Sequence, residues 1–371
     1  MRFPEFTEEW EEHALAEYLD FKNGLNPDVK RIGRGLPFIS VMDILADGTI
    51  NYDSIRGKVE ATEREIENFS VEKGDILFQR SSETLEDVGR ANVYMDNRTA
   101  VYGGFVIRGR KIGDYNPLFF KYLLSTPLAR KRTCRMGAGA QHFNIGQDGL
   151  SKISLCFPLM EEQNKIARLL SLIDERIVTQ NKIIDKLQSL IKGLRVCCMQ
   201  RNGSDNVYLS EIAQIYQPKT ISSAELTEDG FLVYGANGII GKYKDYNHKT
   251  EQICITCRGN TCGMVNYTKP MSWITGNAMV INTDKYQDKV YKKYLYHYLS
   301  AYNFNSIISG SGQPQIVRTP LEKLKITLPT ISEQKQKAMI LDKIQDKIEI
   351  NHNVLNLYIL QKQYLLRQMF I

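Results

Sequence analysis

The chain has 371 residues, of which 43% are hydrophobic and 24% charged, and its formal net charge is +6 at pH 7. This length allows two domains with separate cores, and the composition is typical of a soluble globular protein. No run of 18 apolar residues occurs, and residues 1–6 lack the apolar core of a signal peptide, which argues against a membrane span and against export.

We therefore expect a cytoplasmic protein. Its seven cysteines are then expected to be thiols rather than a disulfide framework. The positive net charge is compatible with a nucleic-acid partner, but a solvated basic surface explains it equally well.

The first domain is expected at residues 1–157. A short helix leading into a strand is predicted for residues 10–21, and strands are predicted for residues 36–44 and 73–80. A helix is predicted from residue 116, because Asn116 suits the N-cap and Pro117 the first turn. A glycine-rich segment follows at residues 137–145, and its backbone amides could approach a phosphate closely.

A long helix is expected next, within a helical spacer at residues 158–201. The segment 161–200 contains no proline and only one glycine. Its apolar residues, together with Gln180, recur at alternating steps of four and three, which indicates a heptad seam. The seam comprises Ile166, Leu170, Ile173, Ile177, Gln180, Ile184, Leu187, Ile191, Leu194 and Cys198.

The second domain, expected at residues 202–328, opens as the first one does, because residues 209–215 match residues 15–21. Strands are predicted for residues 231–234 and 252–258, a helix for residues 290–300, and a glycine-rich segment for residues 310–316. Arg80 and Arg258 both lie where a strand runs into a polar loop, so they are candidates for phosphate or guanine contacts. A local ion pair explains either arginine alone.

The long helix returns in a second spacer, at residues 329–371. Pro158 recurs as Pro329 and Gln163 as Gln334, a shift of 171 positions that also relates Asn144 to Gln315. We expect Asn144 and Gln315 to brace the strands that follow them. At the domain starts the shift is 194, so the first domain is longer by 23 residues. Two domains with matching ends but different interior sequences suggest that each domain recognises a different target.

The two long helices are expected to pack on each other in antiparallel fashion, because the first leaves domain one and the second leaves domain two. The second helix carries a weaker seam, which Lys337 and Lys362 interrupt. It comprises Leu341, Ile344, Ile348, Asn351, Leu355, Tyr358, Leu365 and Met369. Gln180 and Asn351 are each the twentieth residue of their segments and would meet near the centre. They either set the register through a buried polar contact or lie at the seam edge in water.

Three motifs fail on inspection. Residues 236–243 resemble a phosphate-binding loop, but Ala236 replaces its first glycine and Tyr243 its Ser/Thr. Cys254, Cys257 and Cys262 with His248 match zinc-ligand types, but the first two would point to opposite faces of a strand. Residues 116–119 fall one proline short of the amino-methyltransferase signature. We expect no metal, no cofactor and no catalytic residue.

Two dissimilar domains, each followed by a matching long helix, resemble the specificity subunit of type I restriction-modification enzymes. The resemblance covers the whole chain and is carried by residues 2–10, 36–39, 310–316 and 329–335. It implies an α+β protein with two target-recognition domains and an antiparallel coiled-coil spacer, acting in phage defence. Each domain would recognise half of a split double-stranded DNA site. The helices would dock two modification subunits, through which restriction subunits join.

On this interpretation, catalysis resides in the partner subunits. The residues that we expect to contact DNA are Lys30, Arg31, Arg34, Arg80, Arg90, Gln141, Lys242, Lys244, Arg258, Asn260 and Gln313. Two alternatives remain open: a fused DNA methyltransferase or restriction enzyme, and a helical adaptor that binds two proteins and no DNA. The absence of a cofactor motif argues against the former, and a salt-dependent shift of duplex DNA would exclude the latter.

Overall fold

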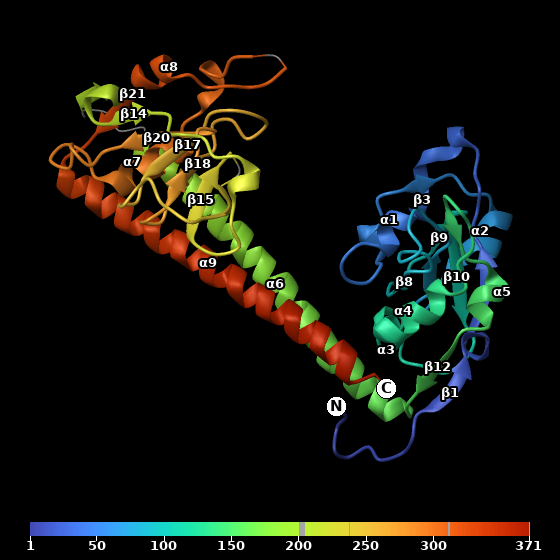
Figure 1. Ribbon diagram of the computed structural model, residues 1–371. Coiled ribbons are helices and arrows are strands. Elements are labelled where there is room, and N and C mark those ends of the chain that lie inside the picture. Colours follow the sequence, from blue (N-terminus) through green and yellow to red (C-terminus); the bar gives the residue numbers. More distant parts are fainter. Residues whose placement is uncertain (200–204, 237, 311, 371) are drawn as a thin grey trace. The chain divides into compact units, whose positions relative to one another are not determined.

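The computed structural model describes residues 1–199, 205–236, 238–310 and 312–370 (Figure 1). The chain forms two compact units: unit 1 is Met1–Asn181 with Val354–Ile371, and unit 2 is Lys182–Asn353. Each unit contains one mixed α/β domain and a part of both long helices, which confirms the predicted fold class. The predicted domain boundary at residue 201 and the side chain of Cys198 lie outside the described residues.

The centre of unit 1 is an antiparallel sheet in the order β2-β10-β6-β8. Its strands are Leu19–Asn23 (β2), Val106–Lys111 (β10), Ile76–Gln79 (β6) and Ala91–Val93 (β8). A second sheet has the order β4-β3-β9-β5, in which β3 and β9 are parallel. Its strands are Lys58–Val59 (β4), Ile32–Ile39 (β3), Ala100–Tyr102 (β9) and Ser70–Val71 (β5). Two further antiparallel pairs join Glu11–Ala14 (β1) to Ser154–Phe157 (β12), and Ser81–Ser82 (β7) to Phe143–Asn144 (β11).

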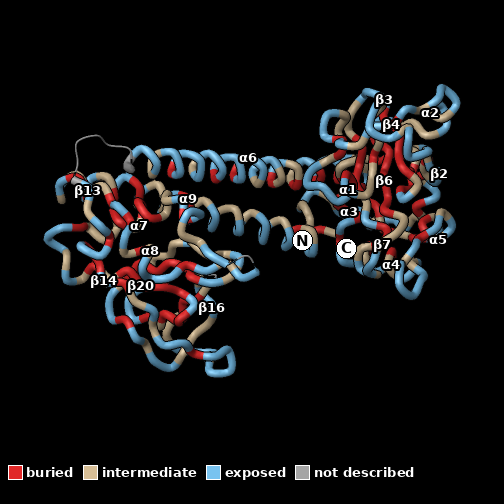
Figure 2. The backbone as a smooth tube through the Cα atoms, turned by 90° about the horizontal axis from the view of Figure 1, so that it is seen from above, coloured by how far each residue is buried: buried red, intermediate tan, exposed pale blue. Residues whose placement is uncertain are grey.

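Helices cover these sheets. They are Val41–Ile44 (α1), Glu63–Phe69 (α2), Pro117–Ser125 (α3), Pro127–Cys134 (α4) and Gln147–Ser151 (α5), with 3-10 turns at Leu15–Glu17 (η1), Val29–Arg31 (η2) and Tyr52–Ser54 (η3). The predicted cap of α3 is confirmed, because Asn116 Oδ1 accepts from the N–H groups of Leu118 and Phe119, both at 3.0 Å. Figure 2 shows that the buried residues concentrate in the strands, where Phe78 and Ile107 pack against Phe119 of α3.

Two local predictions were wrong. Residues 11–17 form a strand and a 3-10 turn rather than a helix, because β1 is held by pairing with the distant β12. The strand expected at residues 36–44 ends at Ile39. Ser40 is the N-cap residue of α1, and Asp43 Oδ2 accepts from the backbone N–H of Ser40 at 2.7 Å.

Unit 2 repeats the arrangement of the main sheet of unit 1, but its second sheet has three described strands rather than four. Its main sheet has the order β14-β20-β17-β18, with strands Gln214–Tyr216 (β14), Ala278–Asn282 (β20), Ile253–Thr256 (β17) and Val265–Tyr267 (β18). The second sheet contains Gly238–Tyr243 (β16), Phe231–Gly235 (β15) and Trp273–Ile274 (β19), and its β15 and β19 are parallel. The remaining pair is Asp205–Tyr208 (β13) with Lys325–Leu328 (β21). The helices are Lys292–Ala301 (α7) and Arg318–Glu322 (α8), with 3-10 turns at Leu209–Glu211 (η4), Ser223–Glu225 (η5) and Phe304–Ser306 (η6).

The long helices are Met160–Met199 (α6) and Ile331–Gln368 (α9). In unit 1 the start of α6 packs against the end of α9: Asp174 pairs with Lys362 at 2.5 Å, and Arg176 donates to the Tyr358 hydroxyl at 3.2 Å. In unit 2 the end of α6 packs against the start of α9. Ile191 of α6 lies there in one apolar cluster with Leu341 and Ile348 of α9. The predicted antiparallel direction is confirmed.

The heptad seams are also confirmed, because no described seam side chain is exposed. Lys362, which interrupts the second seam, pairs with Asp174 and lies over the Tyr122 ring at 5.5 Å. Gln180 is buried, whereas Asn351 is half-buried and donates to the Lys347 carbonyl at 2.6 Å. Their role as a register pair stays a prediction.

A buried glutamine joins each domain to its long helix. Gln163 Nε2 donates to the Pro158 carbonyl at 3.0 Å, and its Oε1 accepts from the Asn116 N–H before α3 at 3.0 Å. Gln334 makes the equivalent bonds, to the Pro329 carbonyl at 2.9 Å and from the Tyr291 N–H before α7 at 2.8 Å. These contacts explain why proline and glutamine recur together in the sequence.

We predict that Gln163→Leu lowers the free energy of unfolding by about 1–3 kcal/mol, because it leaves a buried carbonyl and a buried N–H without partners. Urea denaturation followed by far-ultraviolet circular dichroism measures the change. Gln361→Leu on the exposed face of α9 is the matched control and should stay within about 0.5 kcal/mol of the wild type. Equal effects of the two substitutions would contradict the structural role of Gln163.

Candidate nucleic-acid interface

Three segments of unit 1 meet where β6 ends. The Arg80 N–H donates to the Phe105 carbonyl at 2.9 Å, and the Arg80 carbonyl accepts from the Ile145 N–H at 2.9 Å. The turn before β10, the end of β6 and the glycine-rich segment therefore lie side by side. We call this set, represented by Arg80, Phe105 and Asn144, edge 1.

Unit 2 contains the same arrangement where β17 ends. The Cys257 N–H donates to the Asn277 carbonyl at 3.0 Å, and the Cys257 carbonyl accepts from the Ile316 N–H at 3.0 Å. We call the set of Cys257, Asn277 and Gln315 edge 2. These bonds place Cys257, not Arg258, at the position equivalent to Arg80. Arg258 corresponds to Ser81, since both form a bridge to the equivalent residues Gln315 and Asn144.

The two glycine-rich segments form matching hairpins. Asn144 exchanges two backbone hydrogen bonds with Ala138, at 2.8 and 2.9 Å, and Gln315 exchanges two with Ser309, also at 2.8 and 2.9 Å. Asn144 and Gln315 thus each close a hairpin through backbone groups, but the elements that follow them are the short helices α5 and α8 rather than the strands that we expected them to brace. The candidates Gln141 and Gln313 are exposed within these hairpins.

Several basic candidates in unit 1 already have local partners. Arg31 forms an ion pair with Glu65 and holds the pKa of that carboxyl at about 2, chiefly through the side-chain hydrogen bond. Arg34 pairs with Glu60 at 2.7 Å, and Arg90 with Asp87 at 2.7 Å. Arg34 and Arg90 nonetheless remain more than half exposed, with side-chain exposures of 73% and 52%, so DNA could compete for them.

The two lysine candidates of unit 2 lie away from edge 2. Lys242 is on β16 opposite Leu232, at the far end of the hairpin from Gly235 and Gly238. It lies 3.3 Å from Asp229, and Lys244 follows it as an exposed residue. The structure therefore does not bring these lysines together with Arg258, Asn260 and Gln313.

Arg258 opens onto a cavity of about 390 Å³ at edge 2. Gln315, Tyr216 and Arg318 also line this cavity, and Arg318 pairs with Glu322 at 2.6 Å. Sequence analysis missed Arg318, which lies directly after the glycine-rich hairpin. Within the described parts of the chain, Arg258 has no carboxylate within 4.0 Å, so its charge remains available to a polyanion.

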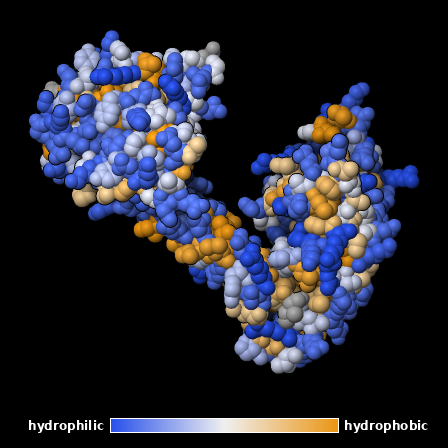
Figure 3. All heavy atoms as spheres, viewed as in Figure 1, coloured by the Kyte–Doolittle hydropathy of each residue, from blue (hydrophilic) through white to orange (hydrophobic). Residues whose placement is uncertain are grey.

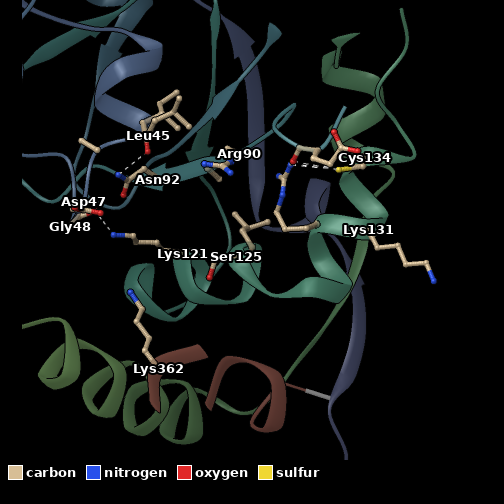
Figure 4. A pocket seen from close by; sticks show the side chains of 16 residues that line it. Leu45, Asp47, Gly48, Arg90, Asn92, Lys121, Ser125, Lys131, Cys134 and Lys362 are labelled. Carbon is tan, nitrogen blue, oxygen red and sulfur yellow. Dashed lines mark hydrogen bonds between the residues drawn. The ribbon is translucent and has the colours of Figure 1, made fainter. Parts of the chain in front are cut away.

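A second basic cavity, of about 480 Å³, lies in unit 1 between α3, α4 and the loop after α1 (Figure 4). Lys121 points from α3 toward Gly48, whose carbonyl accepts a hydrogen bond from it, and burial lowers the pKa of Lys121 to about 8. Arg130 donates to the carbonyls of Glu86 and Val88, at 2.8 and 2.6 Å. The residues come from separate segments, so no local sequence pattern indicates this cavity.

The described cysteines of unit 2 do not form a metal site. Cys254 packs with Tyr234 and Ile274, whereas Cys257 packs with Phe304 in a different cluster, so the two thiols do face apart. Among the described residues, no group of three potential metal ligands is present. In the same residues, no helix combines the length and apolarity needed to cross a membrane.

The family described as Type I restriction modification DNA specificity domain matches this chain twice, at residues 7–189 and 202–357. The chain therefore belongs to that family. It is similar to a putative type I restriction enzyme specificity subunit of Methanocaldococcus jannaschii, with 25% identity over 93% of this chain and 89% of the relative. A second similar protein is the EcoKI specificity subunit of Escherichia coli, 26% identical over 44% of this chain and 38% of that protein.

Solved structures agree on the fold. A type I restriction-modification S subunit from M. genitalium superposes with a TM-score of 0.67, at 16% identity over 98% of this chain and 96% of that one. A chain from a structural study of complex assembly in a type I restriction-modification system gives a TM-score of 0.58 at 14% identity, over 97% of both chains. The family and its named relatives identify the chain as a DNA specificity subunit rather than a catalytic one.

Proposed function

We propose that this chain recognises a bipartite DNA site, with edge 1 contacting one half-site and edge 2 the other. The observation that carries the proposal is the repetition of one backbone frame with different side chains at its edge. Equivalent hydrogen bonds hold Phe105 beside Arg80 and Asn277 beside Cys257. Contacts to base edges specify the sequence, and exposed side chains at the edges can make them. A shared protein backbone frame that presents different side chains therefore suits two domains that recognise different sequences.

The charges at the edges support DNA as the ligand. Arg80 at edge 1 and Arg258 at edge 2 lie beside the ends of the two hairpins, and the same hairpins carry the exposed amides of Gln141 and Gln313. Arginine contacts phosphates and guanine, and glutamine pairs with adenine in the major groove. Among the other candidates, Arg34, Arg90, Lys242 and Lys244 would act as phosphate contacts at the margins.

The long helices would hold the two domains at a fixed separation. Each helix spans roughly 60 Å, compared with about 34–36 Å for one turn of DNA. Half-sites on a matching helical phase would then be selected by the length of the helices. The restriction and modification activities would reside in partner subunits.

We also propose that two modification subunits dock on the helices. Large apolar side chains remain exposed there, and Figure 3 shows hydrophobic spheres along the helical region. In unit 1, Leu357, Leu360 and Tyr364 lie three and four residues apart on α9, so they share one face, and they are 65%, 59% and 53% exposed. An apolar stripe on a helix that already has a packed seam is typical of a protein interface.

We predict that exchanging residues 16–144 for the same region of a relative with another target changes only one half of the methylated site. The reciprocal control exchanges residues 210–315 and should change only the other half. Methylated bases are mapped by single-molecule sequencing of DNA modified by the assembled complex. A change in both halves, or in neither, would refute the modular proposal.

We predict that four residues inserted after Gln180, with four more after Asn351, widen the gap between unchanged half-sites by one or two base pairs. The insertions lengthen each helix by about 6 Å and just over one turn, and one base pair is about 3.4 Å. The control replaces two exposed helix residues, Thr179 and Asn353, by alanine without changing length, and its gap should match the wild type. An unchanged gap in the insertion variant would show that the helices do not set the spacing.

We predict that Leu357→Glu combined with Leu360→Glu weakens binding of the modification subunit by at least about tenfold, because charge replaces apolar contact. Analytical ultracentrifugation of the mixed subunits measures the affinity. Ile112→Glu changes an equally exposed apolar residue away from the helices and should leave assembly unchanged. Wild-type affinity in the double variant would remove this face as the docking site.

A further inference from the structure

The turn between β9 and β10 exposes an aromatic ring. Phe105 is 68% exposed, although the neighbouring residues Tyr102 and Val106 are fully buried. Ile32 and Met42, 49% and 70% exposed, line an adjacent apolar cavity of about 390 Å³ together with Phe105. A large apolar side chain held in solvent by a rigid turn is typical of a contact surface.

Unit 2 contains the same turn with a different side chain. The Val106 N–H donates to the Gly103 carbonyl at 2.9 Å, and the Ala278 N–H donates to the Thr275 carbonyl at 3.0 Å. Together with the bonds from Arg80 and Cys257, this makes Asn277 the structural counterpart of Phe105. Asn277 is also exposed.

A glycine directly precedes Phe105 and Asn277 in the two turns, and there is little space beside either glycine. A Cβ atom on Gly104 would collide with the Asn26 side chain, and one on Gly276 would collide with the Thr220 side chain. Asn26 and Thr220 follow the equivalent strands β2 and β14. A side chain at either glycine would require Asn26 or Thr220 to move, so glycine fits each turn without rearrangement, whereas the next residue differs between the two units.

We infer that Phe105 and Asn277 are equivalent specificity-determining residues, one for each half-site. This inference rests on the proposed function and names the side chains that carry it. An aromatic ring can contact the C5-methyl group of thymine. An asparagine side chain can instead pair with adenine, because its amide nitrogen donates to N7 and its amide oxygen accepts from N6–H. Phe105 therefore selects by apolar contact, and Asn277 selects by hydrogen bonding.

Neighbouring groups fit this assignment. Arg80 Nη1 donates to the Gly104 carbonyl at 3.4 Å, so a cation lies directly beside the first turn. Arg258 lies next to Cys257, whose N–H bonds the Asn277 carbonyl, so a cation also lies near the second turn. Positive charge beside an exposed turn would bring the turn close to the phosphate backbone.

The test uses the complete specificity and modification complex carrying Phe105→Asn, Asn277→Ala or Asn277→Phe. Methylated motifs are mapped on random-sequence DNA. Phe105→Asn should alter base preference at one position of one half-site, and each Asn277 variant should alter one position of the other. Discrimination at that position should change by at least about fivefold, as expected from the loss or gain of one base contact.

Ile112→Asn is the matched control, because Ile112 is 60% exposed and directly follows β10, whereas Phe105 directly precedes that strand. It should leave the motif unchanged. Phe105→Ala, which removes the ring without adding a polar group, serves if Phe105→Asn does not fold. An unchanged motif in folded Phe105 and Asn277 variants would overturn the inference, as would a uniform loss of methylation without a change in motif. A wild-type complex whose motif is not split would instead overturn the proposed function.

Discussion

The amide of a buried glutamine at each junction between domain and helix is the contact on which the rest of the structure depends. Gln163 and Gln334 each accept from the backbone before a domain helix and donate to a proline carbonyl at the start of a long helix. Because both partners are backbone groups, the amide fixes the direction in which the long helix leaves its domain. A rigid exit is necessary for any helix that sets a distance.

Within each domain the backbone and the exposed side chains have separate roles. Sheet and turn hydrogen bonds hold edge 1 and edge 2 in equivalent frames, and the buried strands supply the packing that makes those frames rigid. The exposed side chains at the edges contribute little to the core. They can therefore differ, as Phe105 and Asn277 do, without a cost to the fold.

Net positive charge alone is a poor guide to the interface. Arg31 is tied to Glu65, Lys362 to Asp174, and Arg130 to two backbone carbonyls, so these cations stabilise the domain and the helix packing. Arg258 has no carboxylate neighbour among the described residues and faces a cavity at edge 2. Local pairing thus decides which cations remain for a polyanion.

The sequence by itself determined the repeat, the two long helices with their heptad seams, their antiparallel direction and the family. These features follow from the spacing of residues and from the order of the segments, and both can be read directly from the sequence. Only the tertiary structure decided which edge residues are equivalent. The offset is 171 from Asn144 to Gln315, 172 from Phe105 to Asn277 and 177 from Arg80 to Cys257. Insertions change the offset between strands, so the equivalence of Phe105 and Asn277 follows from the hydrogen bonds within each unit and not from a constant offset. Strand pairing likewise places Lys242 away from the turn of its hairpin.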